Sequence, residues 1–414
     1  MMRKQSETDL YYSPPKNTNI AWIYPWKNAL SDIFISTLNM GLLDENKTID
    51  IVSRFFPLKE TIYLDSGRSA IIVALKGWGI GHGDEVILST FNCQAVIDPI
   101  INLGATPVLV DTDQYGKIDV DQIKKYSSGK TRAIILTNIY GVLDNFEEIH
   151  KFALKRNIKI VNDLCQSLIT PKTYSKYFDK DDVVYIFSFG FEKHLFAIGG
   201  GALFSKNRKF VDKISKKYKF QMVSSYETSV AIFARIKYFF TFFIYSRLNF
   251  LVSPLLFLGV INKFDKKKSL NIKVEKIYPK TMNFIQLRIL ANKLQKLDKD
   301  IIENLIKYNY LKDELNKNPN IKFIQGGVIN PLYATILADG ERYELTKYMS
   351  QNGIPSVWNY IPLHFFPIYR NYGRGKFLNS GKLWRNVISL PFRGKVGNKL
   401  LNKTVETLKD FYTK

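Results

Sequence analysis

Hydrophobic residues follow two alternating patterns between residues 61 and 190. Apolar side chains three or four positions apart, as in residues 69–80, are typical of helices, and short continuous apolar runs, as in residues 85–89, are typical of buried strands. Further strands are predicted at 106–111, 132–138, 158–163 and 183–189, and further helices at 95–104 and 146–157. Strands and helices that alternate in this way predict an α/β domain around a largely parallel sheet.

The same pattern divides the chain into four parts. The predicted parts are an irregular N-terminal segment (1–60), a large α/β domain (61–228), an apolar and aromatic insertion (229–275) and a smaller C-terminal α/β domain (276–414). A chain of 414 residues is long enough for one large or two modest domains. Because ligands bind parallel sheets where strands end and loops begin, chemistry is expected at the strand ends of the large domain.

The segment 229–261, SVAIFARIKYFFTFFIYSRLNFLVSPLLFLGVI, is unusually aromatic and apolar. Arg235, Lys237 and Arg247 interrupt it, so no apolar run reaches the roughly 18 residues that a membrane-spanning helix needs. Three interpretations stay open: buried helices or a subunit interface, a helix lying at an anionic membrane surface, and a true span. The basic run at 266–268 that follows would suit anionic headgroups.

Composition adds a strong positive charge to this picture. Sixty Lys and Arg residues stand against 37 Asp and Glu residues, a formal net charge of +23. This excess favours anionic partners, such as a phosphorylated substrate, an acidic membrane face or nucleic acid, although a Lys-rich composition with no single partner explains it equally well. No helix-turn-helix, zinc-finger or RNP signature is found, so a nucleic-acid partner is not expected.

Several other classes of protein are not expected from the sequence. Two cysteines, Cys93 and Cys165, are too few for a secreted disulfide scaffold, and the N-terminus lacks the apolar core of a signal peptide. A cytoplasmic protein is therefore expected, peripheral at the inner face of the membrane if the insertion docks there. The four histidines show no zinc-ligand spacing, so no metal site is expected. The GxSxG and GxxxxGK[ST] motifs are also missing.

Two glycine-containing segments differ in the order of their elements. In GWGIGHGDEVIL a helix precedes the glycines and a strand follows, which is the reverse of a dinucleotide-binding loop, so a helix end and a turn are predicted. In residues 64–69, LDSGRS, an extended segment opens directly into a helix. The first N–H groups of that helix and its dipole would face an anion, whereas the simpler alternative is a serine N-cap.

Acidic, basic and aromatic residues lie near three other predicted strand ends. Asp163 ends a strand, and an acid there can keep a pyridinium nitrogen protonated. Ser188 precedes Lys193 by five residues, and a lysine beside a phosphate-bearing ring can form a Schiff base and then move a proton. Phe91 and Cys93 lie in the loop after 85–89, where a side chain could cover a ring face. A turn-capping acid, a surface lysine and ordinary loop packing are the alternatives.

The chain resembles the DegT/DnrJ/EryC1/StrS family of sugar aminotransferases, which depend on pyridoxal 5'-phosphate (PLP). The matching stretches are SGRSAIIVALKGWGIGHGDEVIL, GATPVLVDTD, TNIYGVLDNFEEIHKFA, IVNDLCQS, FSFGFEKHLFAIGGGALF, NGIPSVWNYIPLHFFPIYR and VISLPF. The Asp-x-x-Gln and Ser-x4-Lys pair is fairly specific. The resemblance implies the type I aminotransferase fold, a homodimer with its active site at the subunit interface, a nucleotide-linked keto sugar as substrate and glutamate as amino donor.

Position by position, the resemblance implies a role for each matching residue. Lys193 corresponds to the lysine that forms the Schiff base, Asp163 to the acid on the pyridine nitrogen and Gln166 to the residue near the ring hydroxyl. The implied phosphate contacts are Gly67, Arg68, Ser69 and Ser188. The implied residues of the substrate cleft are Tyr360 and His364.

The sequence also departs from the family pattern at three positions. The stacking aromatic of many relatives falls at Cys93, so either Phe91 covers the ring or the ring is covered less well. Arg68 replaces a threonine and could add a charge-assisted phosphate contact. Pro279 replaces the asparagine of the Asn-Tyr-x-Met motif that reaches the phosphate from the neighbouring subunit, which puts that contact in doubt.

The sequence therefore predicts PLP-dependent transamination of a nucleotide-linked keto sugar, for surface glycan or related biosynthesis, with Lys193 and Asp163 as the catalytic residues. One branch of the family has histidine in place of the lysine and dehydrates sugars instead. Here Lys193 is intact and His194 lies beside it, which favours transamination over dehydration. A catalytically inactive, membrane-associated scaffold on the same fold is the other alternative.

Overall fold

The structure is a computed structural model of the chain. It describes residues 44–142, 145–167, 169–190, 193–233, 270, 272–324, 330–338, 342–394 and 396–413. Most of the predicted insertion lies outside these residues, so the three interpretations of 229–261 stay predictions. Among the helices that the structure describes, none is both long and apolar enough to cross a lipid bilayer.

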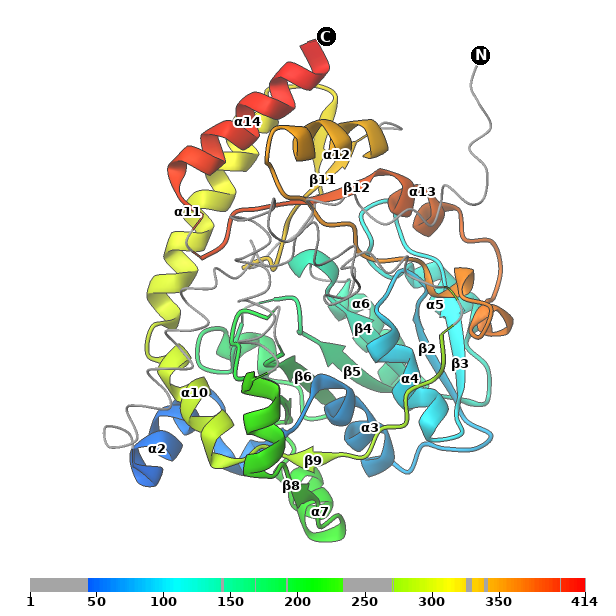
Figure 1. Ribbon diagram of the computed structural model, residues 1–414. Helices are drawn as coiled ribbons and strands as arrows, with labels where there is room; N and C mark the ends of the chain where they lie inside the picture. The colour runs from blue at the N-terminus through cyan, green and yellow to red at the C-terminus, as the bar shows by residue number, and fades with distance from the viewer. Residues whose placement is uncertain are drawn as a thin grey trace, which may run out of the picture.

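A nine-stranded sheet forms the lower part of the molecule in Figure 1, in the order β3-β2-β4-β5-β6-β7-β1-β9-β8. Its strands are β1 (Thr61–Leu64), β2 (Glu85–Ser89), β3 (Thr106–Val110), β4 (Thr131–Thr137), β5 (Lys159–Asp163), β6 (Val183–Ser188), β7 (Gly201–Phe204), β8 (Gln221–Met222) and β9 (Lys280–Thr281). The five strands from β3 to β6 are parallel, whereas β7 is antiparallel to both β6 and β1. The predicted, largely parallel sheet is thus confirmed.

Helices cover both faces of this sheet, which explains why its parallel strands are apolar throughout. The covering helices are α2 (Glu45–Phe55), α3 (Gly67–Gly77), α4 (Gln94–Asn102), α5 (Val120–Tyr126), α6 (Phe146–Lys155), α7 (Arg208–Lys217) and α10 (Phe284–Leu294). Side chains alternate between the two faces along each strand. On β4, Ile134 and Leu136 pack with α2, α5, α6 and α10, whereas Ala133 and Ile135 pack with α3, α4 and α7.

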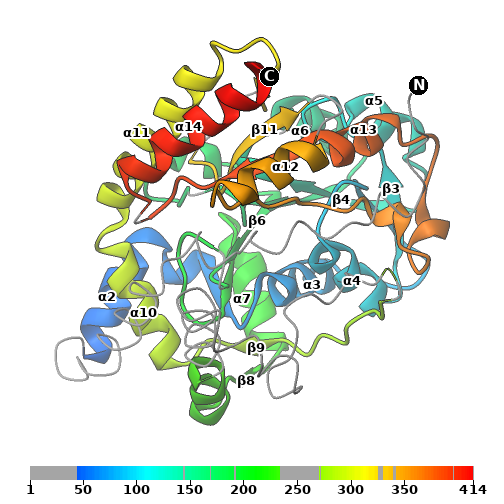
Figure 2. The same cartoon turned by 45° about the horizontal axis from the view of Figure 1, so that its top comes forward.

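A smaller unit lies above the large sheet (Figures 1 and 2). Its antiparallel sheet consists of β10 (Ile321–Phe323), β11 (Ala334–Ala338) and β12 (Val387–Leu390), in that order. Its helices are α11 (Leu297–Leu315), α12 (Arg342–Gln351), α13 (Leu378–Asn386) and α14 (Asn398–Thr413). The long helices α11 and α14 lie side by side, and apolar side chains from the helices and the sheet share one buried cluster.

Within the part of the chain that the structure describes, five short 3-10 helices connect these elements. They are η3 (Leu58–Glu60), η4 (Ile139–Gly141), η5 (Ser175–Phe178), η6 (Leu363–Phe365) and η7 (Arg370–Tyr372). The glycine-rich segment after α3 forms the predicted helix end and turn: Gly79 and Gly83 have φ angles of 78° and 88°, in the left-handed region that glycine adopts readily.

The structure differs from the sequence-based division at residue 276. The predicted smaller domain began there, but β9 pairs with β1 in the large sheet, and α10 packs against α2. The Asp65 N–H donates to the Lys280 carbonyl at 2.8 Å, and the Lys280 N–H donates to the Asp65 carboxylate at 3.2 Å. These bonds join two segments far apart in the sequence, which hydrophobic periodicity does not report.

The C-terminal part of the chain returns to the large sheet a second time. The Leu363 N–H donates to the Thr90 carbonyl at 2.7 Å, and the Arg374 N–H donates to the Leu109 carbonyl of edge strand β3 at 3.0 Å. The Asp111 carboxylate then accepts hydrogen bonds from the first turn of α13, including the Ser380 hydroxyl at 2.6 Å. The segment from η6 to α13 therefore covers one edge of the large sheet.

Candidate active site

The turn between β1 and α3 packs tightly against β7. Ser66 is the N-cap of α3, and its Oγ accepts a hydrogen bond from the Ser69 N–H at 3.2 Å. A Cβ atom on Gly201 would lie 2.5 Å from the Ser66 carbonyl carbon and 2.7 Å from the Gly67 nitrogen, so only glycine fits there. The first N–H groups of α3 and the positive end of its dipole lie at this turn, an arrangement that suits a phosphate.

Gly67 brings three predicted segments together. A Cβ atom on this glycine would lie 3.2 Å from Cys165 Sγ and 3.3 Å from Ser188 Cβ. The end of β1 therefore meets the residues that follow β5 and the last residue of β6. Ser188 is half-buried, and the Gly190 N–H approaches its hydroxyl at 3.5 Å. The predicted phosphate contacts Gly67, Ser69 and Ser188 thus lie in one neighbourhood.

Asp163 is buried at the end of β5, with an exposed fraction of 3%. One carboxylate oxygen accepts the Cys165 N–H at 3.0 Å, and the other faces the Thr137 hydroxyl at 3.4 Å. A buried carboxylate is stable as an anion only if donors or a cation compensate for lost hydration. Asp163 therefore offers a fixed negative charge at the carboxyl edge of the sheet.

Lys193 is half-buried in the loop between β6 and β7, where its N–H donates to the Gly190 carbonyl at 3.0 Å. Its charge reaches the Cys165 thiol: burial raises the pKa of Cys165 well above its usual range, Asp163 adds to this rise, and Lys193 opposes it. A Cβ atom on Gly190 would lie 3.5 Å from Ser188 Oγ and 4.0 Å from Lys193 Cγ, so the lysine side chain lies beside the end of β6. Cys165 stays a neutral thiol, because the rise in its pKa prevails.

His194 points into the junction with the smaller unit. Its Nδ1 lies 3.4 Å from the Arg393 guanidinium, and the residue lines a small cavity together with Asn330 and Pro331. Burial, followed by the charges of Arg393 and Lys193, lowers the pKa of His194 well below its usual range. The imidazole is therefore neutral. The sequence did not predict this contact with Arg393, because a single chain gives no signal for a pair that joins two units.

Gln166 connects the site to two other segments. This residue is buried, and its Oε1 accepts the N–H of Tyr140 at 2.9 Å, while its carbonyl accepts the N–H of Leu332 at 3.1 Å. Tyr140 has a φ of 58°, and its hydroxyl donates to the Asn359 carbonyl. The carboxamide is thus held through its oxygen, and its Nε2 is the group left to face a ligand.

The two predicted substrate residues lie on the segment that crosses from the smaller unit to the large sheet. His364 Nδ1 lies 2.8 Å from the Thr90 hydroxyl, and its ring stacks on Phe377 with 4.2 Å between ring centroids. Burial lowers the pKa of His364 to about 4, so the ring is neutral at physiological pH. Tyr360 is half-buried on the same segment, next to the Asn359 carbonyl that Tyr140 binds.

The two candidates for covering the ring face differ in their surroundings. Phe91 is fully buried, and its ring lies 6.3 Å from that of Tyr140 in the apolar cluster of the smaller unit. Cys93 is half-buried at the start of α4 and, like Cys165, packs against the apolar cluster around α3. Of the two alternatives, Phe91 over the ring or a less well covered ring, this packing favours the second, because the phenyl group already occupies a core position.

The Arg68 side chain has a different partner from the phosphate that the sequence suggested. Its guanidinium forms an ion pair with Glu275. Glu275 is held in place by α4, because its N–H donates to the Asp98 carboxylate at 3.3 Å and its carbonyl accepts from Asn102 at 2.7 Å. The backbone of Glu275 is thus anchored, and its carboxylate, paired with the guanidinium, competes with any more distant anion.

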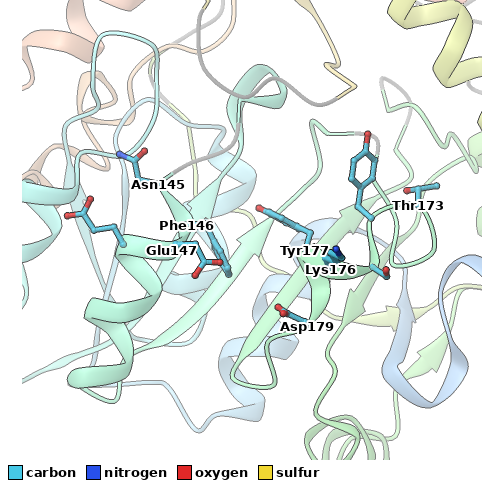
Figure 3. A pocket seen from close by; sticks show the side chains of 10 residues that line it. Asn145, Phe146, Glu147, Thr173, Lys176, Tyr177 and Asp179 are labelled. Atoms are coloured by element: carbon cyan, nitrogen blue, oxygen red, sulfur yellow. The ribbon is translucent and has the colours of Figure 1, made fainter.

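One cavity of about 970 Å³ lies away from these residues, at the start of α6 and along η5 (Figure 3). Its lining includes the carboxylates of Glu147, Glu148 and Asp179 together with the rings of Phe146 and Tyr177. None of its lining residues is a predicted site residue. Three carboxylates stand against one lysine, Lys176, in this lining and would repel a phosphorylated ligand, so the strand ends at Asp163 remain the better candidate.

Comparison with known proteins identifies the family of this chain. The DegT/DnrJ/EryC1/StrS aminotransferase family matches residues 51–234 and 261–409, which is most of the sequence. The chain belongs to this family. Residues 235–260, between the two matched stretches of the aminotransferase, fall within the aromatic segment 229–261.

Individual relatives extend over most of the aminotransferase. A pleiotropic regulatory protein from Geobacillus stearothermophilus is 24% identical over 366 residues, which is 87% of each chain. A dTDP-3-amino-3,6-dideoxy-alpha-D-galactopyranose transaminase from Aneurinibacillus thermoaerophilus is 24% identical over 353 residues, covering 84% of this chain and 85% of the relative. The solved structure of NtdA from Bacillus subtilis with bound cofactor PMP has a TM-score of 0.72 at 18% identity, covering 100% of this chain and 90% of that chain.

These matches confirm the predicted family and the predicted type I aminotransferase fold. They also confirm the predicted enzyme class, a PLP-dependent aminotransferase. The residues at the strand ends fit such a cofactor. The Ser66–Gly67 turn is a cradle that the glycine at 201 keeps open, and a buried carboxylate and a lysine lie beside it. These residues have the chemistry needed to bind the phosphate, the ring nitrogen and the aldehyde of PLP.

We expect Gly201→Ala to weaken both folding and PLP binding. The added Cβ would overlap the backbone of Ser66 and Gly67, so the turn must move, at a cost of about 1–3 kcal/mol for overpacking. Calorimetry and a PLP titration would measure the two effects. Gly129→Ala is the matched control, since a Cβ there meets no atom within 4 Å. An unchanged PLP dissociation constant in Gly201→Ala would exclude the turn from the phosphate site.

Proposed function

We propose that this aminotransferase transfers an amino group from glutamate to a nucleotide-linked keto sugar. The observation that carries the proposal is the meeting of the Ser66–Gly67 turn, Ser188, Asp163 and Lys193 at the carboxyl edge of one sheet. The name of the transaminase from Aneurinibacillus thermoaerophilus supports a nucleotide-linked sugar as substrate. The net charge of +23 suits a substrate that carries a diphosphate.

The chain's own residues would bind and orient the cofactor. PLP, when bound, supplies an electron sink for the substrate carbon from which a proton is removed. The α3 N-terminus and the Ser188 hydroxyl would hold its phosphate. Asp163, as a buried anion, would keep a proton on the ring nitrogen, and the Gln166 Nε2 would donate to the ring hydroxyl. The Arg68 guanidinium pairs with Glu275. Arg68 would therefore contribute to the phosphate site through its backbone N–H instead.

Lys193 would carry out the proton transfers. Its Nζ would first hold the cofactor covalently and, once displaced by glutamate, act as a free amine. As a general acid and base it would move the proton from the glutamate α-carbon to the cofactor in the first half-reaction, and in the second it would take a proton from the cofactor and deliver it to the sugar carbon that receives the amino group. Neutral His194 and the neutral Cys165 thiol beside it would not compete for these protons, because burial dominates both of their pKa shifts.

The proposal can be tested with the visible absorption spectrum of the purified protein. A cofactor band that borohydride fixes and that glutamate shifts would support the cofactor and the amino donor together. Peptide mass spectrometry after borohydride treatment should find the added mass on Lys193. A protein without such a band, even after addition of PLP, would contradict the proposal and favour the non-catalytic scaffold.

Sugar dehydration on the same fold is the second candidate. It would require another group to replace the lysine as the base, and His194 is the adjacent imidazole. Its Nδ1 lies against Arg393 and the pKa of His194 is lowered well below its usual range by burial, so this ring is held away from the role. The intact Lys193 therefore supports transamination.

We also propose that the enzyme is a homodimer. Large apolar side chains are exposed around β8 and β9, with exposed fractions of 62% for Met222, 78% for Tyr226, 69% for Phe233 and 72% for Tyr278. Monomers rarely expose apolar residues in such a group. Because β9 pairs with β1 just before the Ser66 turn, a second copy on this face would lie near the proposed phosphate site.

Analytical ultracentrifugation would test the dimer, and liposome flotation would test an anionic membrane as the alternative partner of this face. A dimer that separates in Tyr226→Lys and Phe233→Lys, without flotation of the wild type, would support the proposal. A monomer that floats with anionic vesicles would contradict it and would revive the membrane interpretation of 229–261.

A further inference from the structure

Two buried residues outside the predicted site form hydrogen bonds that lead to Asp163. Asn92 and Thr137 have exposed fractions of 1% and 7%. Asn92 follows β2, and Thr137 is the last residue of β4. Neighbouring parallel strands carry both residues to the carboxyl edge of the sheet, where β5 ends in Asp163.

The geometry fixes the direction of these hydrogen bonds. The Asn92 Oδ1 accepts the Cys93 N–H at 2.8 Å, so the amide nitrogen of Asn92 must face Thr137. That nitrogen donates to the Thr137 hydroxyl oxygen at 2.9 Å. A hydroxyl has one proton to give. Because the Thr137 oxygen accepts from Asn92, the Thr137 hydroxyl proton is directed at the Asp163 carboxylate, whose Oδ2 lies 3.4 Å away.

We propose that Asn92 and Thr137 are positioning residues that hold the Asp163 carboxylate toward the cofactor ring. Their relay supplies a donor to Oδ2, while the Cys165 N–H supplies one to Oδ1 at 3.0 Å. The proposal rests on the proposed role of Asp163 at the ring nitrogen. Neither residue touches the cofactor in this scheme, and both act through Asp163.

The physical need for such a relay follows from burial. A carboxylate inside a protein loses its hydration, and donors that point at both of its oxygens replace the lost water. They also fix the plane of the carboxylate, which decides whether one oxygen meets a ring nitrogen in line. The backbone beneath is held as well, because the Asn138 N–H and side-chain amide both donate to the Asp163 carbonyl at 3.1 Å.

Thr137→Val tests the relay, since valine keeps the shape of threonine and removes the hydroxyl. We expect the dissociation constant of PLP from the full-length protein to rise on the order of tenfold, the usual effect of losing one hydrogen bond to a charged group. Thr137→Ser keeps the hydroxyl and should restore binding close to the wild-type value. Wild-type affinity in Thr137→Val, or a Thr137→Ser protein as weak as Thr137→Val, would overturn the proposal.

A matched control separates this effect from a loss of stability. Thr335 is buried in the small sheet, and its hydroxyl bonds to Ser389 at 3.0 Å. Thr335→Val therefore removes a comparable buried hydrogen bond far along the chain from β4. Both valine variants should lower the melting temperature of the cofactor-free protein by similar amounts, but only Thr137→Val should weaken PLP binding. Equal weakening of PLP binding in the two variants would overturn the proposal.

A double-mutant cycle with Asp163→Asn distinguishes the relay from the role of Asp163 itself. In the Asp163→Asn background, Thr137→Val should change PLP affinity less than about twofold, because the carboxylate charge that the Thr137 hydroxyl stabilises is gone. A tenfold effect that persists would overturn the relay and leave the role of Asp163 standing. Wild-type PLP affinity and turnover in Asp163→Asn alone would instead overturn the proposed function at this residue.

Discussion

Lys193→Ala is expected to abolish transamination, with kcat reduced by a factor on the order of 10⁴ or more. The lysine would hold the cofactor and then move protons in both half-reactions, and loss of a general acid or base alone costs about 10²–10⁴-fold. Residues that act as a unit cannot replace one another, so no neighbour should restore the rate. The neutral His194 and Cys165 are poor substitutes, since burial lowers the pKa of the first and raises that of the second.

Single-turnover mixing with glutamate would measure this loss, and the spectrum would report the missing covalent attachment. Lys209→Ala is the control, because this lysine is exposed on α7. The control variant should keep wild-type kinetics and the cofactor band. A Lys193→Ala protein with full activity would remove Lys193 from the mechanism.

Asp163→Asn is expected to lower kcat by a factor of about 10²–10³ while the cofactor stays bound to the lysine. An asparagine keeps the shape of the side chain and can still accept the Cys165 N–H, but it carries no charge to hold a proton on the ring nitrogen. Loss of one pre-organised electrostatic contact in a buried site costs about 2.7–4 kcal/mol in the transition state. The defect should therefore lie in the chemical step.

The position of the loss can be measured by comparing kcat with the glutamate KM. A fall in kcat with little change in KM would agree with a contact that strengthens in the transition state. Asp182→Asn is the control, since Asp182 pairs with His150 near the start of β6 and lies outside the site. A variant at Asp163 with normal kcat would contradict the electrostatic role.

The sequence predicted the parallel strands of the large sheet because their signals are local. Apolar runs and helical spacing lie within ten or so residues, and the structure reproduces them at β2, β3, β4, β5 and β6. The candidate residues Gly67, Asp163 and Ser188 were likewise found from short motifs at strand ends. The structure brings them close to Lys193, which is what the order of parallel strands requires.

The remaining features depend on pairs that lie far apart in the chain. The ion pair of Arg68 with Glu275 and the hydrogen bond of Thr90 with His364 each join segments separated by some two hundred residues or more. Hydrophobic periodicity reports which face of an element is buried, but it does not report the partner. The burial of Phe91 could not be read from its loop for the same reason, since its neighbour Tyr140 follows another strand.

The segment from η6 to α13 has a consequence for how the enzyme matures during synthesis. It supplies the backbone partners of Thr90, which follows β2, and of Leu109 in β3, both of which are made more than 250 residues earlier. Until this segment emerges from the ribosome, edge strand β3 offers unpaired backbone groups to other chains, and the Thr90 hydroxyl lacks its partner His364. Nascent chains that stop before residue 363 should therefore depend on chaperones, and catalytic competence should arise only after this segment has been made.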